Sequence, residues 1–425
     1  MTPSALARLT AAELLDAADT LLVYRRAGDG VEPFICLSAA DDIIGYCGHV
    51  DLGQGIRTAL TQIVAEELDV PPGAVEMVLG DTARAPNQGP TIASDSIQHT
   101  AVPLRRAAAQ ARAALLARAA GRLGVPVEDL RVEDGLIGTE SGNHRLAYGE
   151  LLAGERIRLE LDEGHPVKPV SAYRIVGRPQ PRVDIPAKVA GQAVFVHDLR
   201  VDGMVHGRVV RPPYAGVDHG PFVGTSLVAV DEGSVAHLPG FIAVIAIGDF
   251  VGVVAEREEQ AIAAAEALRV EWKPVPTLPD LDDLAMALRA NPSIARRVED
   301  RGDVEAALAG SATRLTRRYV WPYQMHGSIG PSCAVADIGP GHARVWAGTQ
   351  NPHPLRADIA RLLDLPEAAV DLVRMEAAGC YGRNCADDVA ADAALLSRAV
   401  GRPVRVQLTR EQEHLWEPKG TAQLM

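Results

Sequence analysis

Two glycine-rich turns, each between an expected strand and an expected helix, constrain this chain more than any other feature. The first turn, residues 53–55 (Gly-Gln-Gly), follows an apolar run at 43–52 and precedes residues 56–68, whose apolar side chains recur at helical spacing. The second turn, residues 379–384 (Gly-Cys-Tyr-Gly-Arg-Asn), precedes a helical pattern at 387–401 that ends at a glycine. Two such strand–turn–helix units predict a mixed α/β protein.

The chemistry of these turns does not by itself prove a ligand site. A helix start carries unpaired backbone N–H groups and the positive end of the helix dipole, so the first turn suits an anionic or oxygen-bearing ligand. Thr58 stands where a dinucleotide-binding fingerprint needs a third glycine, which disfavours an NAD-dependent dehydrogenase. At the second turn, Asp387 and Asp388 can cap the helix themselves. Spacing alone therefore leaves open a glycine turn without a ligand at both places.

Composition limits the partners of the chain. Its 425 residues are enough for two to four domains. The 42 Lys and Arg against 55 Asp and Glu give a formal net charge of −13, which repels phosphate backbones and anionic lipids. No apolar run reaches the ~18 residues of a membrane span, and the first residues do not resemble a secretion signal. These features predict a cytoplasmic protein that binds no nucleic acid and has no membrane span.

The five cysteines argue against a metal centre held by this chain. They are an odd number and contain no Cys-x-x-Cys pair, which predicts reduced thiols and neither structural zinc nor an iron–sulfur cluster. Cys380 and Cys385 are expected to be packed thiols, and no metal-ligating side chain is predicted. Electrons that move through the protein would be carried by another chain.

Other polar residues give weaker signals. His326 and residues 349–353 (Thr-Gln-Asn-Pro-His) follow expected strands, where open α/β sheets often bind ligands, although a lone histidine is more often structural. No Ser/His/Asp grouping and no His-Glu-x-x-His motif occurs, so a hydrolase has no positive support.

The chain divides into three segments by pattern. Residues 1–180 alternate strand and helix signals, and a Pro- and Arg-rich stretch at 177–192 is typical of a linker. Residues 184–300 contain short strand-like runs and one helix, as in a compact α+β domain. Residues 310–425 return to an α/β pattern. We therefore expect a multidomain α+β or mixed α/β fold.

Several ordered motifs resemble the xanthine dehydrogenase and aldehyde oxidase family, the molybdenum hydroxylases. Residues 48–82, which contain Gly-Gln-Gly, and residues 86–96 resemble a molybdopterin-contacting segment of that family. Residues 349–360 and 379–384 resemble a second cofactor segment, and 184–272 resembles the hammerhead-like α+β domain. The resemblance covers nearly the whole chain. It implies two molybdopterin-binding segments that flank a hammerhead-like domain.

The order of the motifs resembles the isoquinoline 1-oxidoreductase and nicotinate dehydrogenase branch, because the Gly-Gln-Gly segment precedes the hammerhead-like domain. The resemblance implies an oxidoreductase that hydroxylates N-heteroaromatic rings at a C–H bond with oxygen from water. It implies molybdenum on molybdopterin, with or without a cytosine nucleotide, and a small [2Fe-2S] subunit that passes electrons to an FAD or cytochrome acceptor. The alternatives are an aldehyde oxidoreductase subunit and a non-catalytic scaffold or remnant.

The resemblance also assigns roles to particular residues. Gln54 matches the family glutamine that hydrogen-bonds an oxygen on molybdenum, and it is the predicted catalytic residue. Cys380 and Arg383 replace small family residues in the second turn. The complete set of predicted cofactor-binding residues is Gly53, Gln54, Gly55, Thr91, Ser94, Gly379, Cys380, Tyr381, Gly382 and Arg383.

The family's catalytic base is a glutamate in a late Gly-x-Gly-Glu segment, and the sequence ends before that segment. Glu411, Glu413 and Glu417 are expected to be exposed carboxylates rather than substitutes for it. The resemblance therefore implies a hetero-oligomer in which a companion molybdopterin-binding chain supplies the glutamate.

Overall fold

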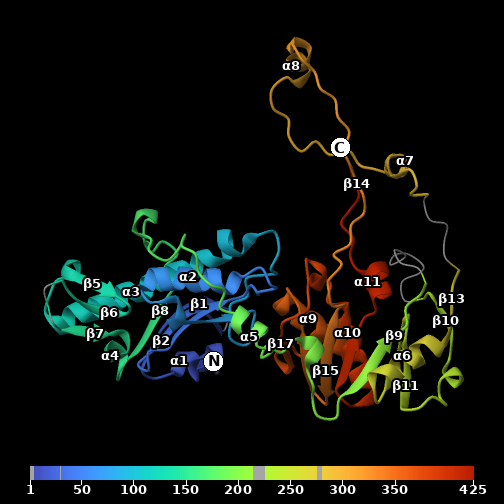
Figure 1. Ribbon diagram of the computed structural model, residues 1–425, viewed down its shortest axis with the longest axis horizontal. Helices are drawn as coiled ribbons and strands as arrows, with labels where there is room; N and C mark the ends of the chain where they lie inside the picture. The colour runs from blue at the N-terminus through green and yellow to red at the C-terminus, as the bar shows by residue number, and fades with distance from the viewer. Residues whose placement is uncertain (1–3, 29, 141, 143, 214–224, 275–279) are drawn as a thin grey trace.

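Two α/β units make up the described part of the chain. The computed structural model describes residues 4–28, 30–140, 142, 144–213, 225–274 and 280–425. Figure 1 shows the first unit in blue to blue-green and the second in green to red, with the short helix α5 (Ile185–Val189) between them. The predicted mixed α/β, multidomain architecture is confirmed.

The first unit is built on a mixed sheet with the strand order β4-β3-β2-β1-β8. The three central strands pair antiparallel, whereas β4 is parallel to β3 and β8 is parallel to β1. The strands are β1 (Thr20–Ala27), β2 (Gly30–Ser38), β3 (Ile43–Cys47), β4 (Val75–Leu79) and β8 (Arg156–Glu160).

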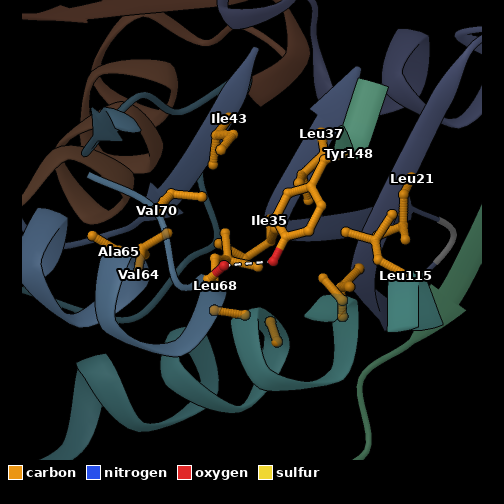
Figure 2. Packing of buried hydrophobic residues seen from close by; sticks show 14 of the residues in the cluster. Leu21, Ile35, Leu37, Ile43, Val64, Ala65, Leu68, Val70, Leu115 and Tyr148 are labelled. Carbon is orange, nitrogen blue, oxygen red and sulfur yellow. Dashed lines mark hydrogen bonds between the residues drawn. The ribbon is translucent and has the colours of Figure 1, made fainter. Parts of the chain in front are cut away.

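Helices cover both faces of this sheet. Because side chains alternate along a strand, Leu21 and Ile35 face α2 (Ile56–Leu68) and α3 (Ala101–Leu123), and Figure 2 shows this packing. Leu22 belongs to a separate apolar cluster with Leu14 of α1 (Ala11–Asp16). The predicted helix at 56–68 is confirmed at its bounds. It begins directly after the first glycine turn, so the core of this unit determines where that turn lies.

A small sheet and one helix complete the first unit. They are β5 (Leu130–Glu133), β6 (Leu136–Thr139), β7 (Arg145–Ala147) and α4 (Tyr148–Leu152). The hydroxyl of Tyr148 donates a hydrogen bond to the carbonyl oxygen of Leu68, which Figure 2 shows as a dashed line. This bond ties α4 to the C-terminal end of α2.

The second unit is built on a seven-stranded sheet with the order β11-β12-β9-β18-β15-β16-β17. Helices α9 and α10 pack on this sheet and contribute to its main apolar core. The elements are β9 (Val205–Val209), β11 (Phe241–Ile247), β12 (Phe250–Ala255), β15 (Cys333–Gly339), β16 (His342–Ala347), α9 (Pro352–Leu363), β17 (Val370–Arg374), α10 (Asp388–Val400) and β18 (Val404–Gln407).

The sheet joins two segments that the sequence divides. Strands β9, β11 and β12 come from residues 184–300, whereas β15 to β18 come from 310–425. β18 pairs in parallel with β9, and Gly207 of β9 leaves space for Leu396 of α10, because a Cβ there would lie 2.5 Å from a Leu396 methyl carbon. The two segments therefore share one sheet and one apolar core. Pairing between strands about two hundred residues apart is not visible in local patterns.

The remaining elements lie around the second unit or in an extended arm. Helix α6 (Glu258–Ala267) packs on β9 and β12, and β10 (Leu227–Asp231) pairs with β13 (Arg269–Trp272). Figure 1 shows α7 (Leu284–Ala290) and α8 (Val304–Gly310) on an arm that extends away from both sheets. Near the C-terminus, α11 (Arg410–Trp416) precedes β19 (Gln423–Leu424), which pairs with β14 (Val320–Trp321) of the arm.

Candidate functional site

A cavity of about 1010 Å³ lies between the two units, and both glycine turns line it. A volume of this size is at the upper end of small-molecule and cofactor sites. Eight of the ten predicted site residues line the cavity: Gly53, Gln54, Gly55, Thr91, Ser94, Gly379, Tyr381 and Gly382. The other two, Cys380 and Arg383, lie behind the second turn and are only 1% and 0% exposed.

A residue close in the sequence holds the backbone of the first turn. The carboxylate of Asp51 accepts hydrogen bonds from the backbone N–H groups of Gly53 (2.8 Å), Gly55 (3.3 Å) and Arg57 (3.0 Å). Both glycines have positive φ angles, 104° and 87°, which a glycine adopts most readily. The sequence predicted unpaired N–H groups here, whereas Asp51 already satisfies three of them. The turn is therefore less suited to a second anion than expected.

The amide of Gln54 is partly engaged within the same turn. Its Oε1 accepts from the N–H of Leu52 at 2.6 Å, and its Nε2 donates to the carbonyl of Val50 at 3.0 Å. An amide NH₂ group has two hydrogens, so one N–H of Gln54 remains to donate into the cavity. Gln54 is also exposed, so few packing contacts hold it there.

The loop at residues 91–97 forms a further wall of the cavity. Ala93 and Ser94 adopt left-handed φ angles of 54° and 61°, a conformation that costs energy in residues other than glycine. His49 is buried below the loop, with its Nδ1 2.8 Å from the hydroxyl of Ser96. Burial lowers the pKa of His49, so its ring is neutral near pH 7. Thr91 Oγ1 accepts a hydrogen bond from the backbone N–H of Val50, which lies between β3 and the first turn.

Gln350 joins the cavity walls and was not among the predicted site residues. Its Nε2 donates to the carbonyl of Thr91 at 2.8 Å, and its own carbonyl accepts from the N–H of Thr91 at 2.9 Å. Its Oε1 accepts from the thiol of Cys380 at 2.9 Å. Gln350 is 3% exposed and lines the cavity, so its amide is held more firmly than that of Gln54. In the sequence, only the position of residues 349–353 after an expected strand pointed to Gln350 as a site residue.

The second turn needs its glycines for space as well as for conformation. Gly379 has a φ of 105°, and a Cβ there would lie 2.9 Å from the backbone nitrogen of Ile329. The hydroxyl of Ser328 donates to the carbonyl of Cys380 at 3.0 Å. Tyr381 has a φ of 55°, is 63% exposed and lines the cavity. The turn therefore presents an aromatic ring to the cavity from a backbone held by distant residues.

The two aspartates after the second turn bind tertiary partners and do not cap the helix that follows. Asp387 is buried and accepts from the hydroxyl of Thr349 at 2.6 Å, and burial raises its pKa to about 8. Asp388 pairs with Arg383 at 2.8 Å and with Arg211 at 2.9 Å. Neither side chain makes a helix-capping hydrogen bond at this helix start. The predicted capping role is therefore wrong, because tertiary partners occupy both carboxylates.

The expected exposure of the late glutamates is wrong for two of the three. Glu411 is exposed, but Glu413 and Glu417 are 0% and 3% exposed. Glu413 accepts from the guanidinium Nε of Arg383 at 3.1 Å, and Glu417 accepts from the backbone N–H of His326. Local sequence could not reveal this burial, because α11 folds back onto the second turn. Glu413 supports the turn from behind through Arg383, and neither carboxylate lines the cavity.

No group of three or more His, Cys, Asp or Glu side chains that could hold a metal ion occurs within the described residues. All five cysteines are free, and only Cys385 is exposed. Burial raises the pKa of the Cys380 thiol. Within the same described residues, no helix is both long enough and apolar enough to cross a membrane.

The cavity fits a large organic cofactor. Nothing lies within 4 Å of the position of a Cβ on Gly53, so a ligand can approach the backbone of the first turn. The second turn approaches the cavity through Gly379 and Gly382, and small or neutral residues form most of the lining. This lining can bind an extended polar ring system through backbone groups.

Comparison with known proteins identifies the class. Two family models, both described as molybdopterin cofactor-binding domains, match residues 34–204 and 289–425. Together these matches cover most of the chain, which therefore belongs to the molybdopterin cofactor-binding proteins. The predicted resemblance is confirmed.

Three relatives show which proteins the chain resembles in sequence. A nicotinate dehydrogenase subunit of Pseudomonas putida is 62% identical over 92% of this chain and 33% of that protein. A membrane-bound aldehyde dehydrogenase of Gluconacetobacter polyoxogenes is 29% identical over 91% of this chain and 51% of that protein. The beta subunit of isoquinoline 1-oxidoreductase from Brevundimonas diminuta is 28% identical over 88% of this chain and 54% of that protein. The chain thus spans from one third to about half of the length of these relatives.

Proposed function

We propose that this chain is the molybdopterin-binding part of a molybdenum hydroxylase that oxidises an N-heteroaromatic substrate, of the nicotinate or isoquinoline type, at a ring C–H bond. The observation that carries the proposal is that three distant segments, at 53–55, 91–97 and 376–382, line one cavity. The 62% identity to a nicotinate dehydrogenase chain supports the substrate class.

The cofactor would be held mainly by backbone and small side chains. Gly53 and Gly55 would bring the first turn close to it, Thr91 and Ser94 would lie on its pterin side, and Gly382 would bring the second turn close. When bound, the molybdenum cofactor supplies the two-electron oxidation of the substrate. The proposal covers the cofactor with or without a cytosine nucleotide.

The chain's own side chains would orient and desolvate the reactants. The remaining N–H of Gln54 can donate to an oxygen that gains negative charge in the cavity, and a fixed donor stabilises such charge best. The amide of Gln350 lies in the same cavity and is more rigid, so it is the competing candidate for this donor. The exposed ring of Tyr381 offers an apolar face to a planar substrate.

The remaining parts of the enzyme are proposed to lie on other polypeptides. A companion molybdopterin-binding chain would supply the catalytic glutamate, a small [2Fe-2S] subunit would take the electrons, and an FAD or cytochrome group would accept them. Two of the relatives are themselves named as subunits, which supports a multi-subunit enzyme. We also propose that residues 184–300 contain a hammerhead-like domain and that the protein is cytoplasmic.

Substrate profiling of the purified, assembled complex tests the function. We expect stoichiometric molybdenum and turnover of nicotinate or isoquinoline with an artificial electron acceptor. Turnover of aldehydes but not of N-heteroaromatic rings would favour the aldehyde oxidoreductase alternative, which the aldehyde dehydrogenase relative supports. A complex without molybdenum would favour the scaffold alternative and reject the proposal.

Paired substitutions test the two amides. Gln54→Ala should lower kcat by about 100-fold with the fold retained, as expected for loss of one donor to a developing charge. Gln350→Ala in the same complex is the comparison. A normal kcat in Gln54→Ala and a large loss in Gln350→Ala would transfer the donor role to Gln350.

A further inference from the structure

A charged pair lies on the cavity wall where the two units meet. Among the described residues that line the cavity, Lys188 and Glu376 are the charged ones, and neither was singled out from the sequence. Lys188 lies on α5, and Glu376 follows β17. The ammonium Nζ of Lys188 is 2.8 Å from Asp184 Oδ2 and 3.4 Å from Glu376 Oε2. Lys188 therefore connects the inter-unit helix to the strand that leads into the second turn.

The same helix is connected to the first turn. The guanidinium of Arg182 binds both oxygens of Asp184, at 2.9 and 2.6 Å, and its Nη1 donates to the carbonyl of Gly53 at 2.6 Å. This pairing holds the pKa of Asp184 well below its usual range, so the carboxylate is ionised at neutral pH. The N–H of Val183 donates to Thr58 Oγ1 at 3.0 Å, which fixes the segment to α2.

A second path links Glu376 directly to the first turn. Arg374 donates from Nη1 to Glu376 Oε1 at 3.2 Å and from Nη2 to the carbonyl oxygen of Asp51. Asp51 in turn binds the N–H of Gly53, as described above. The contacts form a closed ring from Gly53 through Arg182, Asp184, Lys188, Glu376, Arg374 and Asp51 back to Gly53.

Substitution of Lys188 would break two contacts of this ring at once. Lys188 is the shared cation of two carboxylates, Asp184 and Glu376. Without it, Asp184 keeps Arg182 and Glu376 keeps Arg374, but no cation lies between the two carboxylates, so their mutual repulsion at this partly buried site is less well compensated. Both Lys188 and Glu376 have side chains only 22% exposed, so solvent screens this repulsion less than on an open surface.

We infer that Lys188, Asp184 and Glu376 are positioning residues that hold the two glycine turns at the separation needed to bind the cofactor. The inference rests on the proposed function, because the ligand between the turns is taken to be the molybdenum cofactor. The three residues act through the turns, and their chemistry requires only that they stay paired. A change at Lys188 should therefore alter cofactor retention before it alters the fold.

The test uses the assembled, molybdenum-containing complex. Lys188→Met keeps the length of the side chain and removes its charge. We expect molybdenum retention during dialysis to weaken by about tenfold, as for other supports of a bound metal group. The electron paramagnetic resonance spectrum of the reduced metal should change in the molecules that keep it, while circular dichroism stays unchanged. Lys188→Arg should restore most of the retention, because it restores the charge.

A matched control and a double variant make the result specific. Arg344→Met breaks another ion pair of the second unit, Arg344–Asp371 at 2.8 Å, which is more than half exposed and does not line the cavity. This variant should retain molybdenum normally. Glu376→Gln combined with Lys188→Met should be no worse than Lys188→Met alone, because the repelling carboxylate is gone.

The outcomes separate this inference from the proposed function. Wild-type retention and spectrum in Lys188→Met would overturn the inference, and so would an equal loss in Arg344→Met. If Lys188→Met does not assemble, Glu376→Gln alone decides, with normal retention and spectrum counting against the inference. A wild-type complex without molybdenum would instead reject the proposed function.

Discussion

The two glycine turns look alike in the sequence but are held by different kinds of interaction. The turn at 53–55 is fixed by Asp51, which lies within six residues of all its N–H partners. The turn at 379–384 is fixed by Ser328 and Gln350, and by Glu413 through Arg383. The N–H groups of the first turn are thus held locally, although distant arginines contact the carbonyls of Asp51 and Gly53, whereas the second turn depends on the packing of its whole unit. Substitutions should have local effects at the first turn and global effects at the second.

The largest expected effect is at Arg383. Its substitution by Met leaves the buried carboxylate of Glu413 without its cation, and breaking a buried ion pair on one side costs about 3–5 kcal/mol. Urea unfolding of the assembled complex should show a loss of this size. Arg361→Met, which removes an exposed pair with Asp358, should change the free energy of unfolding by less than about 1 kcal/mol. Equal losses in the two variants would remove the contrast between the turns.

The next effect compares two glycines with almost the same backbone angle. Gly53 and Gly379 have φ angles of 104° and 105°, so alanine is strained at both, by about 1–3 kcal/mol. A Cβ at Gly53 meets no atom within 4 Å, whereas at Gly379 it lies 2.9 Å from the Ile329 nitrogen. Gly379→Ala should therefore lower the free energy of unfolding by about 1–3 kcal/mol more than Gly53→Ala. Equal values would mean that the second turn shifts without cost.

A smaller effect is expected at Asp51. Asp51→Ala removes the acceptor of three backbone N–H groups, which water from the cavity can partly replace, so the loss should be about 1–3 kcal/mol. Hydrogen exchange should become faster in the first turn of α2 and stay unchanged in the second unit. Asp51→Asn keeps one acceptor oxygen and should lose less. Faster exchange throughout the second unit would show that the N–H groups of the first turn are not held locally.

The last comparison concerns pH. Burial raises the pKa of Asp387 to about 8 in the folded protein, far above the value of an unfolded aspartate, about 3.9. Between these values the folded state binds more protons than the unfolded state, so the contribution of Asp387 is complete below about pH 4 and is lost as pH rises towards 8. The melting temperature of Asp387→Asn should fall less than that of the wild type between pH 5 and 8. Parallel curves would contradict the shift.

The sequence predicted more about the first turn than about the second, because the contacts that hold the second turn come from residues distant in the sequence. The helix at 56–68 and its glycine start followed from apolar spacing, because α2 packs on its own unit through one face. The support of the second turn could not be predicted, because α11 lies outside any local pattern and buries Glu413 and Glu417. The run at 349–353 indicated a strand end, but the role of Gln350 depends on Thr91, which lies in the other unit.

The sequence by itself determined the mixed α/β class, the two glycine turns and the family, because short-range periodicity and ordered motifs carry that information. Only the tertiary structure decided that the segments at 184–300 and 310–425 share one sheet and that Lys188 lies beside Glu376 on the cavity wall. Strand pairing and ion pairing between distant residues depend on how the whole chain packs. No local window of the sequence contains both partners of such a contact.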